Sequence, residues 1–390
     1  MDILLWICLI YILYVEVGYL GLLWVVSVLK RQQEVTIACS EPLDVTILLA
    51  VHNEERVIRH KLENILALDY PHEKLQVVVV SDNSTDRTDL ILDEYDSKGV
   101  ILYRMAERGG KIAALRGVEG LIAGVLVVFT DADATFRHDA IQALVRHFGD
   151  PSVGAVSGRE TRPASESIGK GKGEGLFNRI ENLIKTYEGK VGNQVMVHGG
   201  IFAVRRELLP FVPDYLSHDA IVPLQLTLQG YRTIYEPDAV SIEPYELETN
   251  QDWQRRVRTV LQSIQSYLYV KEALNPFKTG FYALQIWSHR FARWFVFPVL
   301  IVALISNLVL ARYSIIYLIV LAVQISCYFL ALIGLILDKV GKRPGIFYYP
   351  FYFVYIHMAV FQAVMMAFWG KKIKVWEPTE RSTTSKIVVL

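Results

Sequence analysis

The chain has 390 residues, of which 52% are hydrophobic and 21% are charged, and its mean hydropathy is +0.29. It is too apolar for an ordinary soluble protein and too charged for a bundle of membrane helices alone. Forty basic and forty acidic residues leave no basic excess that would indicate a nucleic-acid partner. The three cysteines, Cys8, Cys39 and Cys327, are too few and too scattered for a disulfide framework or a zinc site.

The first apolar segment, residues 4–28, is long enough to cross a bilayer despite Glu16 within it. It has neither a basic leader nor a small-residue cleavage site, so residues 1–30 are predicted to be an anchor rather than a signal peptide. Lys30 and Arg31 follow the segment, and positive residues favour the cytoplasmic side. We therefore expect the N-terminus outside the plasma membrane and the following domain in the cytoplasm.

Residues 41–245 are predicted to form this cytoplasmic domain. Short apolar runs alternate there with segments whose apolar residues recur at helical spacing. Such alternation predicts βαβ units and a mostly parallel, Rossmann-like α/β sheet, and strands that are apolar on both faces suit its interior. The expected strands are 45–51, 75–80, 100–103, 125–130 and 154–157, and the expected helices are 54–68, 85–95, 111–123 and 138–148. Glycines and lysines at 169–175 predict a loop, either a lid or a plain surface loop.

Polar residues follow the first three strands, at the carboxyl ends where open α/β sheets bind ligands. Asn53 and Glu54 follow the first strand, where they also fit an acidic helix start. Asp82 follows the second strand, just before residues that can cap the next helix, and its carboxylate is placed to accept the N–H of a base. Lys111 begins a predicted helix after two glycines. Its side chain is either a solvated lysine or a phosphate ligand.

Three further aspartates carry candidate chemistry. Asp131 and Asp133 end the fourth strand two residues apart, so their carboxylates would point the same way. A pair of carboxylates suits Mg²⁺ or Mn²⁺ that holds a diphosphate, whereas an Asp-rich turn is the alternative. Asp219 precedes a predicted helix, where it is either a helix cap or a general base that accepts the proton of a hydroxyl.

The C-terminal part turns apolar again. Residues 250–290 are predicted to be amphipathic helices at the membrane surface, with arginines between apolar residues. Residues 291–370 form the predicted membrane region, with spans at 294–311 and 315–337. Residues 347–369 have basic residues on both flanks, which favours an interfacial or re-entrant helix over a fourth span. Residues 371–390 are the expected cytoplasmic tail.

Taken in order, these motifs resemble those of the family-2 glycosyltransferases, which have a GT-A fold and include the membrane-bound synthases of cellulose, chitin and hyaluronan. The resemblance covers the soluble middle and continues into the C-terminal helices. It implies a membrane-bound inverting enzyme that moves a sugar from a nucleotide diphosphate, with UDP as the expected nucleotide. The acceptor it implies is a polysaccharide or a lipid-linked hydroxyl at the cytoplasmic face.

The same resemblance implies roles for the donor-side residues. Asn53 and Glu54 are similar to the Asn-Glu that ends the family's first strand, and they are expected at the donor nucleotide. Asp82 opens an Asp-Asn-Ser-Thr-Asp element that looks like the family's uracil-ribose contact. The remaining donor-side residues of this type are Lys111, Asp131 and Asp133, of which the two aspartates resemble the metal-binding Asp-x-Asp that takes Mg²⁺ or Mn²⁺.

On the acceptor side, Gly199 and Gly200 are expected to border the acceptor, since Gly200 begins a Gly-x-x-x-x-Arg-Arg segment similar to the family's. Asp219 resembles the base, and His218 stands where the family has glutamate. The family's processive members carry Gln-x-x-Arg-Trp, and the nearest match here, Gln254-Arg-Arg-Val-Arg258, has a displaced arginine and no tryptophan. Arg255 and Arg258 are expected at the donor diphosphate, and processivity stays open.

Other readings of the chain remain. A non-catalytic membrane protein that binds a nucleotide sugar is the main alternative, and His218 supports it. A transporter would place its site among broken membrane helices, whereas the chemistry here lies in the soluble middle. Three or four spans are few for a polysaccharide pore within one chain. A polymer made by a homo-oligomer and transfer to a lipid acceptor therefore both stay open. The sugar, the acceptor and the linkage are not determined by the residues.

Overall fold

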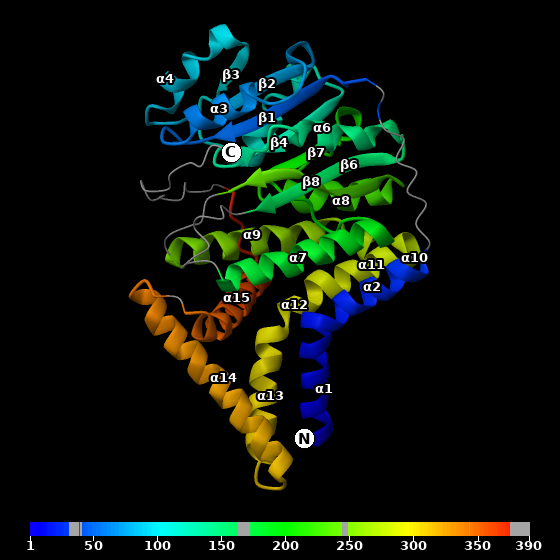
Figure 1. The fold of residues 1–390 in the computed structure, drawn as a ribbon, viewed down its shortest axis with the longest axis vertical. Helices are drawn as coiled ribbons and strands as arrows, with labels where there is room; N and C mark the ends of the chain where they lie inside the picture. Colours follow the sequence, from blue (N-terminus) through cyan, green and yellow to red (C-terminus); the bar gives the residue numbers. More distant parts are fainter. Residues whose placement is uncertain (31–38, 40, 162–171, 244–248, 343, 375–390) are drawn as a thin grey trace.

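The computed structural model describes residues 1–30, 39, 41–161, 172–243, 249–342 and 344–374. A domain built on one sheet lies at one end of the molecule, and helices from both termini extend from the other end (Figure 1). The long helices α7 and α9 lie between these two parts (Figure 1). The predicted division into an α/β domain and a helical region is therefore visible in the arrangement of the elements.

The sheet has eight strands in the order β3-β2-β1-β4-β7-β6-β8-β5. Neighbours β1 and β2, β2 and β3, β1 and β4, and β6 and β8 are parallel, whereas β7 and β5 pair only in antiparallel fashion. The strands are β1 (Val45–Val51), β2 (Leu75–Ser81), β3 (Val100–Arg104), β4 (Leu126–Thr130), β5 (Thr135–Phe136), β6 (Val153–Thr161), β7 (Ile201–Arg205) and β8 (Arg232–Ile242). The mostly parallel α/β sheet is confirmed.

The five predicted strands correspond to β1, β2, β3, β4 and β6. The strands β5, β7 and β8 were not predicted from the sequence. The strand β8 contains Pro237 and three acidic or basic residues, which weaken an apolar strand pattern. The structure pairs β7 with β4 and β6 in antiparallel fashion, and this pairing inserts a strand from late in the chain into the middle of the sheet.

Three of the predicted helices begin two to four residues later than predicted, because the residues after their strands form turns, whereas the third begins at Lys111 as predicted. The helices of the domain are α3 (Ile58–Leu66), α4 (Thr88–Asp93), α5 (Lys111–Arg116), α6 (Ala140–Val145), α7 (Lys172–Val191) and α8 (His218–Leu228). The predicted loop at 169–175 is wrong in part, since residues 172–175 begin α7; residues 169–171 lie outside the described residues. Packing of α7 against α2 and β8 outweighs the helix-breaking effect of its glycines.

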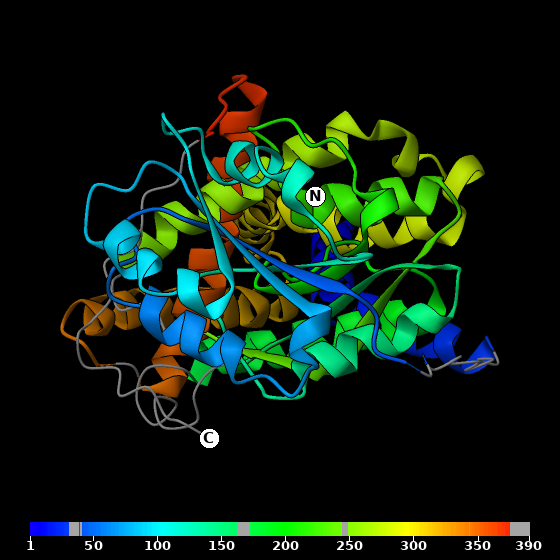
Figure 2. The ribbon, with the colours of Figure 1, turned by 90° about the horizontal axis from the view of Figure 1, so that it is seen from above.

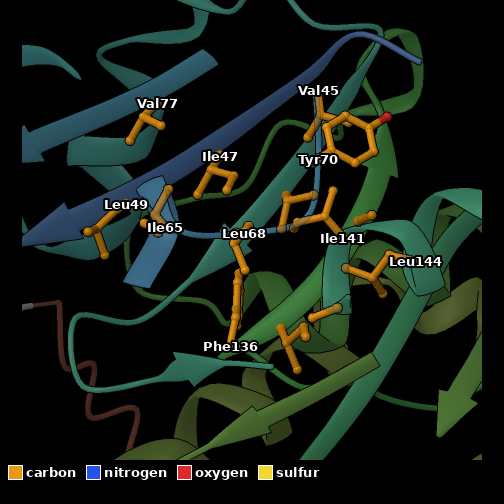
Figure 3. Packing of buried hydrophobic residues seen from close by; sticks show 14 of the residues in the cluster. Val45, Ile47, Leu49, Ile65, Leu68, Tyr70, Val77, Phe136, Ile141 and Leu144 are labelled. Atoms are coloured by element: carbon orange, nitrogen blue, oxygen red, sulfur yellow. The ribbon is translucent and has the colours of Figure 1, made fainter. Parts of the chain in front are cut away.

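The core of the domain lies on both faces of the sheet. On one face, Ile47 and Leu49 of β1 pack with Ile65, Phe136 and residues of α6 (Figure 3). On the other face, the alternate residues of β1 and β2 pack against α5 and α8. All seven residues of β1 are buried, as expected of a strand covered by helices on both sides.

The terminal helices are α1 (Asp2–Leu13), α2 (Tyr19–Leu29), α9 (Thr249–Tyr269), α10 (Pro276–Thr279), α11 (Phe281–Ile286), α12 (Ala292–Trp294), α13 (Val296–Leu310), α14 (Ile315–Lys339) and α15 (Gly345–Phe368). Among the described residues, three helices are long and apolar enough to cross a membrane: the joined α1–α2 unit, α14 and α15. The pair 281–294 and 296–310 would be a fourth, although it is bent by 58°. In Figure 1, α1, α13 and α14 extend away from the sheet.

The helix α15 lies along α9 rather than projecting with α13 and α14. Trp253 Nε1 donates to Gln362 Oε1 at 2.8 Å, and Gln265 Nε2 donates to the carbonyl of Lys371 at 2.6 Å. In Figure 2, which looks down the long axis, α15 crosses the view and α13 is seen end-on. This arrangement is the one expected of an interfacial helix, and its position relative to a membrane stays a prediction.

The apolar face of α9 is covered by protein. Val257, Leu261 and Ile264 are all at most 5% exposed, in a cluster with residues of α8, α11, α12 and α15. The amphipathic pattern that predicts a helix at the membrane surface is therefore accounted for by packing between the α/β domain and the terminal helices. Contact of residues 250–290 with a bilayer stays a prediction.

Candidate functional site

A cavity of about 440 Å³ lies at the carboxyl ends of β1 and β4 and reaches α9. It brings together side chains from distant parts of the chain. Of the predicted site residues, its walls include Glu54, Lys111, Asp131, Asp133, Gly199, Gly200, His218, Asp219, Arg255 and Arg258. Asn53 and Asp82 do not line it, and they belong to the loops just behind it.

Asp82 is fully buried and holds the loop that carries Lys111. Its two carboxylate oxygens accept the N–H groups of Gly109 and Gly110 at 2.7 and 2.9 Å. Gly110 has φ of 91°, a conformation that a side chain disfavours, and α5 begins at the next residue. Asp82 thus positions the start of α5 directly, and its contact with a nucleotide base stays a prediction.

The loops after β1 and β2 are joined to each other through side chains. The Asn53 amide oxygen accepts the backbone N–H of Thr85 at 2.7 Å, and Thr88 Oγ1 accepts the backbone N–H of Glu54 at 2.8 Å. Asn53 has φ of 55°, in the left-handed region that asparagine tolerates. Asn53 therefore acts as a brace between two loops, whereas Glu54 reaches the cavity wall.

At the donor end of the cavity, Lys111 Nζ lies 2.5 Å from Asp131 Oδ1. Burial opposes the charge on Lys111, but Asp131, Asp219 and Asp133 hold its pKa above the ordinary value. Asp131 directly follows β4, and Asp133 lies on the same cavity wall. This end therefore combines two carboxylates with a lysine, which is a set able to bind a cation and a phosphate together.

The sequence analysis missed Lys61, which lies beneath the two aspartates. Its ammonium is buried in the domain and donates to Thr130 Oγ1 at 2.8 Å and to the carbonyl of Ala134 at 2.5 Å. Burial lowers the pKa of Lys61 to about 7, although Asp131 and Asp133 act in the opposite direction. The one signal in the sequence is a lysine on the apolar face of the predicted helix 54–68.

Asp219 lies in the wall of the same cavity, in the first turn of α8. The cap position of this helix is Ser217, so the alternative that Asp219 caps the helix is wrong. Burial raises the pKa of Asp219, while Lys111 and Lys185 act against this rise. A carboxylate with a raised pKa that faces a cavity is suited to accept a proton from a hydroxyl.

His218 packs against the rings of Phe129 and Phe202, and its Nδ1 lies 3.2 Å from Asp219 Oδ1. Burial, followed by the charge of Lys111, lowers the pKa of His218 to about 3. The imidazole is therefore neutral near neutral pH. In this chain the residue before the expected base lies beside the carboxylate and adds no charge to the site.

Gly199 and Gly200 leave space for two carboxylates. A Cβ on Gly199 would lie 2.7 Å from Asp219 Oδ2, and one on Gly200 would lie 2.2 Å from Glu243 Oε1. Thr130 Oγ1 donates to the carbonyl of Gly200 at 3.0 Å, which ties the start of β7 to the end of β4. The antiparallel pairing of β4 with β7 is thus what brings the two glycines to the cavity.

The far end of the same Gly-x-x-x-x-Arg-Arg segment lies elsewhere. Arg205 donates from Nε to the carbonyl of Val153 at 2.8 Å and stacks on the ring of Phe148. Because β7 is extended, its first and last residues lie at opposite ends of the strand, on opposite sides of the domain. Of this segment, only the glycine end borders the cavity, and Arg205 has a structural role.

Further charged residues of the cavity wall were not singled out from the sequence. Lys185 of α7 is 4% exposed, and burial lowers its pKa to about 8 against the effect of Glu181. The others are Glu160, Glu181, Asp214, Glu243, Arg290, Arg293 and Lys374. Nothing in the local sequence distinguishes them from surface charges, because they enter the site only through the packing of α7, α12 and β8.

The two aspartates could supply part of the coordination shell of a divalent cation, with other ligands completing it. Among the described residues, no group of three or more His, Cys, Asp or Glu side chains converges to form a complete metal cage. Mg²⁺ is commonly held by one or two carboxylates, with substrate phosphates and water completing its shell. Asp131 and Asp133 on the wall of a polar cavity match this donor set.

Residues 46–210 match the family model described as glycosyl transferase family 2. Over 165 residues the chain is 32% identical to a beta-monoglucosyldiacylglycerol synthase of Synechocystis, which covers 41% of this chain and 33% of the relative. Over 221 residues it is 30% identical to a poly-beta-1,6-N-acetyl-D-glucosamine synthase of Staphylococcus aureus, which covers 55% and 53% of the two chains. The matches thus span between a third and about half the length of these curated relatives.

The fold has a solved counterpart over nearly its whole length. A mannosyltransferase from Pyrobaculum calidifontis, in complex with GDP-Man and Mn²⁺, superposes with a TM-score of 0.73 at 24% identity. The match covers 94% of this chain and 99% of the other, so it includes the terminal helices. The sheet is that of the GT-A glycosyltransferases, and residues 46–210 are similar to the glycosyl transferase family 2 domain.

Proposed function

We propose that this chain, with its family 2 domain at residues 46–210, is a membrane-bound inverting glycosyltransferase that uses a nucleotide diphosphate sugar. The observation that carries the proposal is one cavity whose wall holds two chemically different groups of residues. Asp131, Asp133 and Lys111 form the first group, and the partly buried carboxylate of Asp219 forms the second. The two groups suit a leaving diphosphate and an attacking hydroxyl, respectively.

At the donor end, Asp131 and Asp133 would hold Mg²⁺ or Mn²⁺, which neutralises the charge that develops on the leaving diphosphate. Lys111 already lies against Asp131 and can exchange this contact for a phosphate oxygen. Arg255 and Arg258 reach the same cavity from α9 and supply further positive charge. In this proposal Asn53, Glu54 and Asp82 hold the nucleotide side of the cavity, partly through the loops they brace.

At the acceptor end, Asp219 takes the proton of the acceptor hydroxyl as its oxygen attacks the anomeric carbon. The bond from that carbon to the diphosphate breaks on the opposite face, and the nucleoside diphosphate leaves. An α-linked donor therefore gives a β-linked product. His218 lies beside the Asp219 carboxylate without adding charge, and the glycines at 199 and 200 let the acceptor approach.

The test is nucleotide release by the purified full chain with a panel of UDP- and GDP-sugars, in the presence and absence of membrane lipid extract. The GDP-sugars belong in the panel because the structure of similar fold contains GDP-Man. We expect turnover of one donor with Mn²⁺ or Mg²⁺ and its loss with EDTA. Metal-dependent nucleotide binding without turnover of any donor would instead support a non-catalytic binding protein.

A further inference from the structure

A second cavity of about 250 Å³ adjoins the active-site cavity on the side of the terminal helices. The two cavities share Phe177, Arg255, Thr259, Arg290 and Arg293 in their walls. The second cavity is bounded by α9, by the α11–α12 segment, by α15 and by the π-helical segment Tyr14–Gly18 that joins α1 to α2. A molecule that extends from this cavity can therefore reach Asp219 from the side of the apolar helices.

The walls of this second cavity are cationic. Four arginines face it: Arg255, Arg256, Arg290 and Arg293. Its one carboxylate is Glu16, which lies 3.1 Å from His357 Nε2. Guanidinium groups at this density are suited to a phosphate, whose oxygens they bind in pairs.

At the junction of the two cavities, several basic residues share carboxylates. Glu181 lies 2.8 Å from Arg293, 3.6 Å from Arg290 and 3.0 Å from His289, which also lies 2.7 Å from Glu188. The Nε of Arg290 is buried and has no hydrogen-bond partner among the described residues. This unused guanidinium donor is suited to an anion that enters the cavity.

Lys185 completes this cluster from the α7 side. Its side chain is buried in the wall of the active-site cavity, and no described residue forms a hydrogen bond or ion pair with its ammonium group. A buried ammonium without a partner is costly, so a ligand that supplies negative charge would be stabilised here. Arg290 also acts on the titration of Lys185, which places the two groups close to each other.

The surroundings point to a lipid rather than to a neutral glycan chain. Trp294, Ile356 and Val360 form the apolar part of the wall, and the α1–α2 unit and α15 that border it are apolar enough to cross a membrane. Among the described residues that line this cavity, Phe177 and Trp294 are the only phenyl or indole rings, which is few for stacking along a glycan chain.

We propose that the second cavity binds the phosphate of a membrane-anchored acceptor lipid, whose hydroxyl-bearing head then extends to Asp219. The inference rests on the proposed glycosyltransferase function and specifies its acceptor class. Arg290 and Arg293, which line both cavities, bind the phosphate oxygens at the junction, and Lys185 adds positive charge from the active-site cavity. The apolar wall of the second cavity admits the first part of the lipid chain. The acceptor is delivered along the membrane and does not enter from the aqueous side of the domain.

The test uses the full chain purified in dodecyl maltoside, a neutral single-chain sugar lipid, and measures bound dodecyl phosphate by native mass spectrometry. We expect dodecyl phosphate to bind despite the excess of the neutral detergent. The variant R290Q should bind it about tenfold more weakly, whereas R290K should retain most of the affinity. R232Q, which removes a half-exposed arginine paired with Asp150, is the matched control and should bind as the parent does.

Inorganic phosphate is the second probe. If it binds as tightly as dodecyl phosphate, the site is a free-anion site and the proposal is overturned. Equal binding of dodecyl phosphate by the parent and R290Q also overturns it, as does a ladder of water-soluble oligosaccharides made from the donor without lipid. If R290Q does not fold, K185M serves as the second variant with the same expectation.

Nucleotide binding with Mn²⁺, measured on the same preparations, separates this inference from the proposed function. Intact nucleotide binding without dodecyl phosphate binding rejects only the lipid phosphate site. Dodecyl phosphate binding without any nucleotide binding rejects the proposed glycosyltransferase and leaves the lipid phosphate site standing.

Discussion

At the scale of single residues, Asp219 is the group on which the proposed chemistry depends most. It is buried enough for its pKa to rise, yet it faces the cavity between Lys111 and Lys185. These two cations act against the rise in the pKa and so favour the ionised carboxylate that a base requires. His218 is neutral beside it, so the ionisation of Asp219 is set by burial and by the two lysines.

Replacing Asp219 with asparagine should lower sugar transfer by about 10²- to 10⁴-fold, because the acceptor proton then has no base to receive it. Nucleotide binding with Mn²⁺ should change little, since Asp131 and Asp133 remain. The matched control is D93N, at an exposed aspartate that pairs with Arg104 on the domain surface. Near-parent transfer by D219N would show that another group is the base.

The pH dependence of transfer gives a second prediction at this scale. Asp219 acts as a base only when deprotonated, so activity should fall on the acid side at a pH above its ordinary pKa of 3.8. Lys185 lowers the pKa of Asp219, so K185M should move this acid limb to higher pH. Rates measured from about pH 4 to 8 test the shift. An acid limb that stays at the same pH in K185M would mean that Asp219 does not control the acid limb. The control is K74M, at an exposed surface lysine.

At the scale of elements, the site depends on the close approach of the start of β7 to the start of α8. The backbone N–H of Val197 donates to the carbonyl of Asp219 at 2.9 Å, and Gly199 lies against the Asp219 carboxylate. A strand and a helix that are separated in sequence are thus held together with no space for a side chain between them.

The variant G199A should therefore lose transfer activity by about tenfold or more, because its methyl group would displace the Asp219 carboxylate. Binding of nucleotide and metal at the other end of the cavity should persist. The control is G120A, since a Cβ on Gly120 meets nothing within 4 Å. Unchanged transfer in G199A would show that the carboxylate can shift without loss of function.

At the scale of the whole molecule, the arrangement of the terminal helices decides how the site meets the membrane. The helix α15 is fastened to α9 at several points, including the 2.8 Å bond from Arg256 to the Tyr352 hydroxyl. It closes the second cavity from below while α13 and α14 extend away (Figure 1). We therefore expect both ends of α15 to lie on the same side of the membrane as the α/β domain.

Cysteine labelling tests this expectation in a chain whose three native cysteines are replaced. An impermeant thiol reagent applied to intact cells should label S314C, in the turn between α13 and α14, and should not label K342C or K371C at the two ends of α15. All three should be labelled after the cells are opened. Labelling of K371C alone among the α15 positions in intact cells would show that α15 crosses the membrane.

Much of this organisation could be predicted from the sequence, because it follows from local patterns. Apolar runs bounded by polar residues identified β1 with its observed ends, and the polar residues after β1, β2 and β4 were expected at one edge of the sheet. The carboxyl ends of parallel strands must meet there, so Glu54, Lys111 and Asp131 were grouped without knowledge of distances. The apolar terminal segments were likewise evident from length and composition.

Only the tertiary structure decided which distant residues complete the site. The insertion of β7 between β4 and β6 brings Gly199 to Asp219, and the burial of Lys61 and Lys185 depends on helices packed from other parts of the chain. The structure also shows that Asp82 accepts hydrogen bonds from two backbone N–H groups and that α15 packs against α9. Periodicity determines which face of an element is buried, whereas the order of strands and the contacts between elements arise from packing across the whole chain.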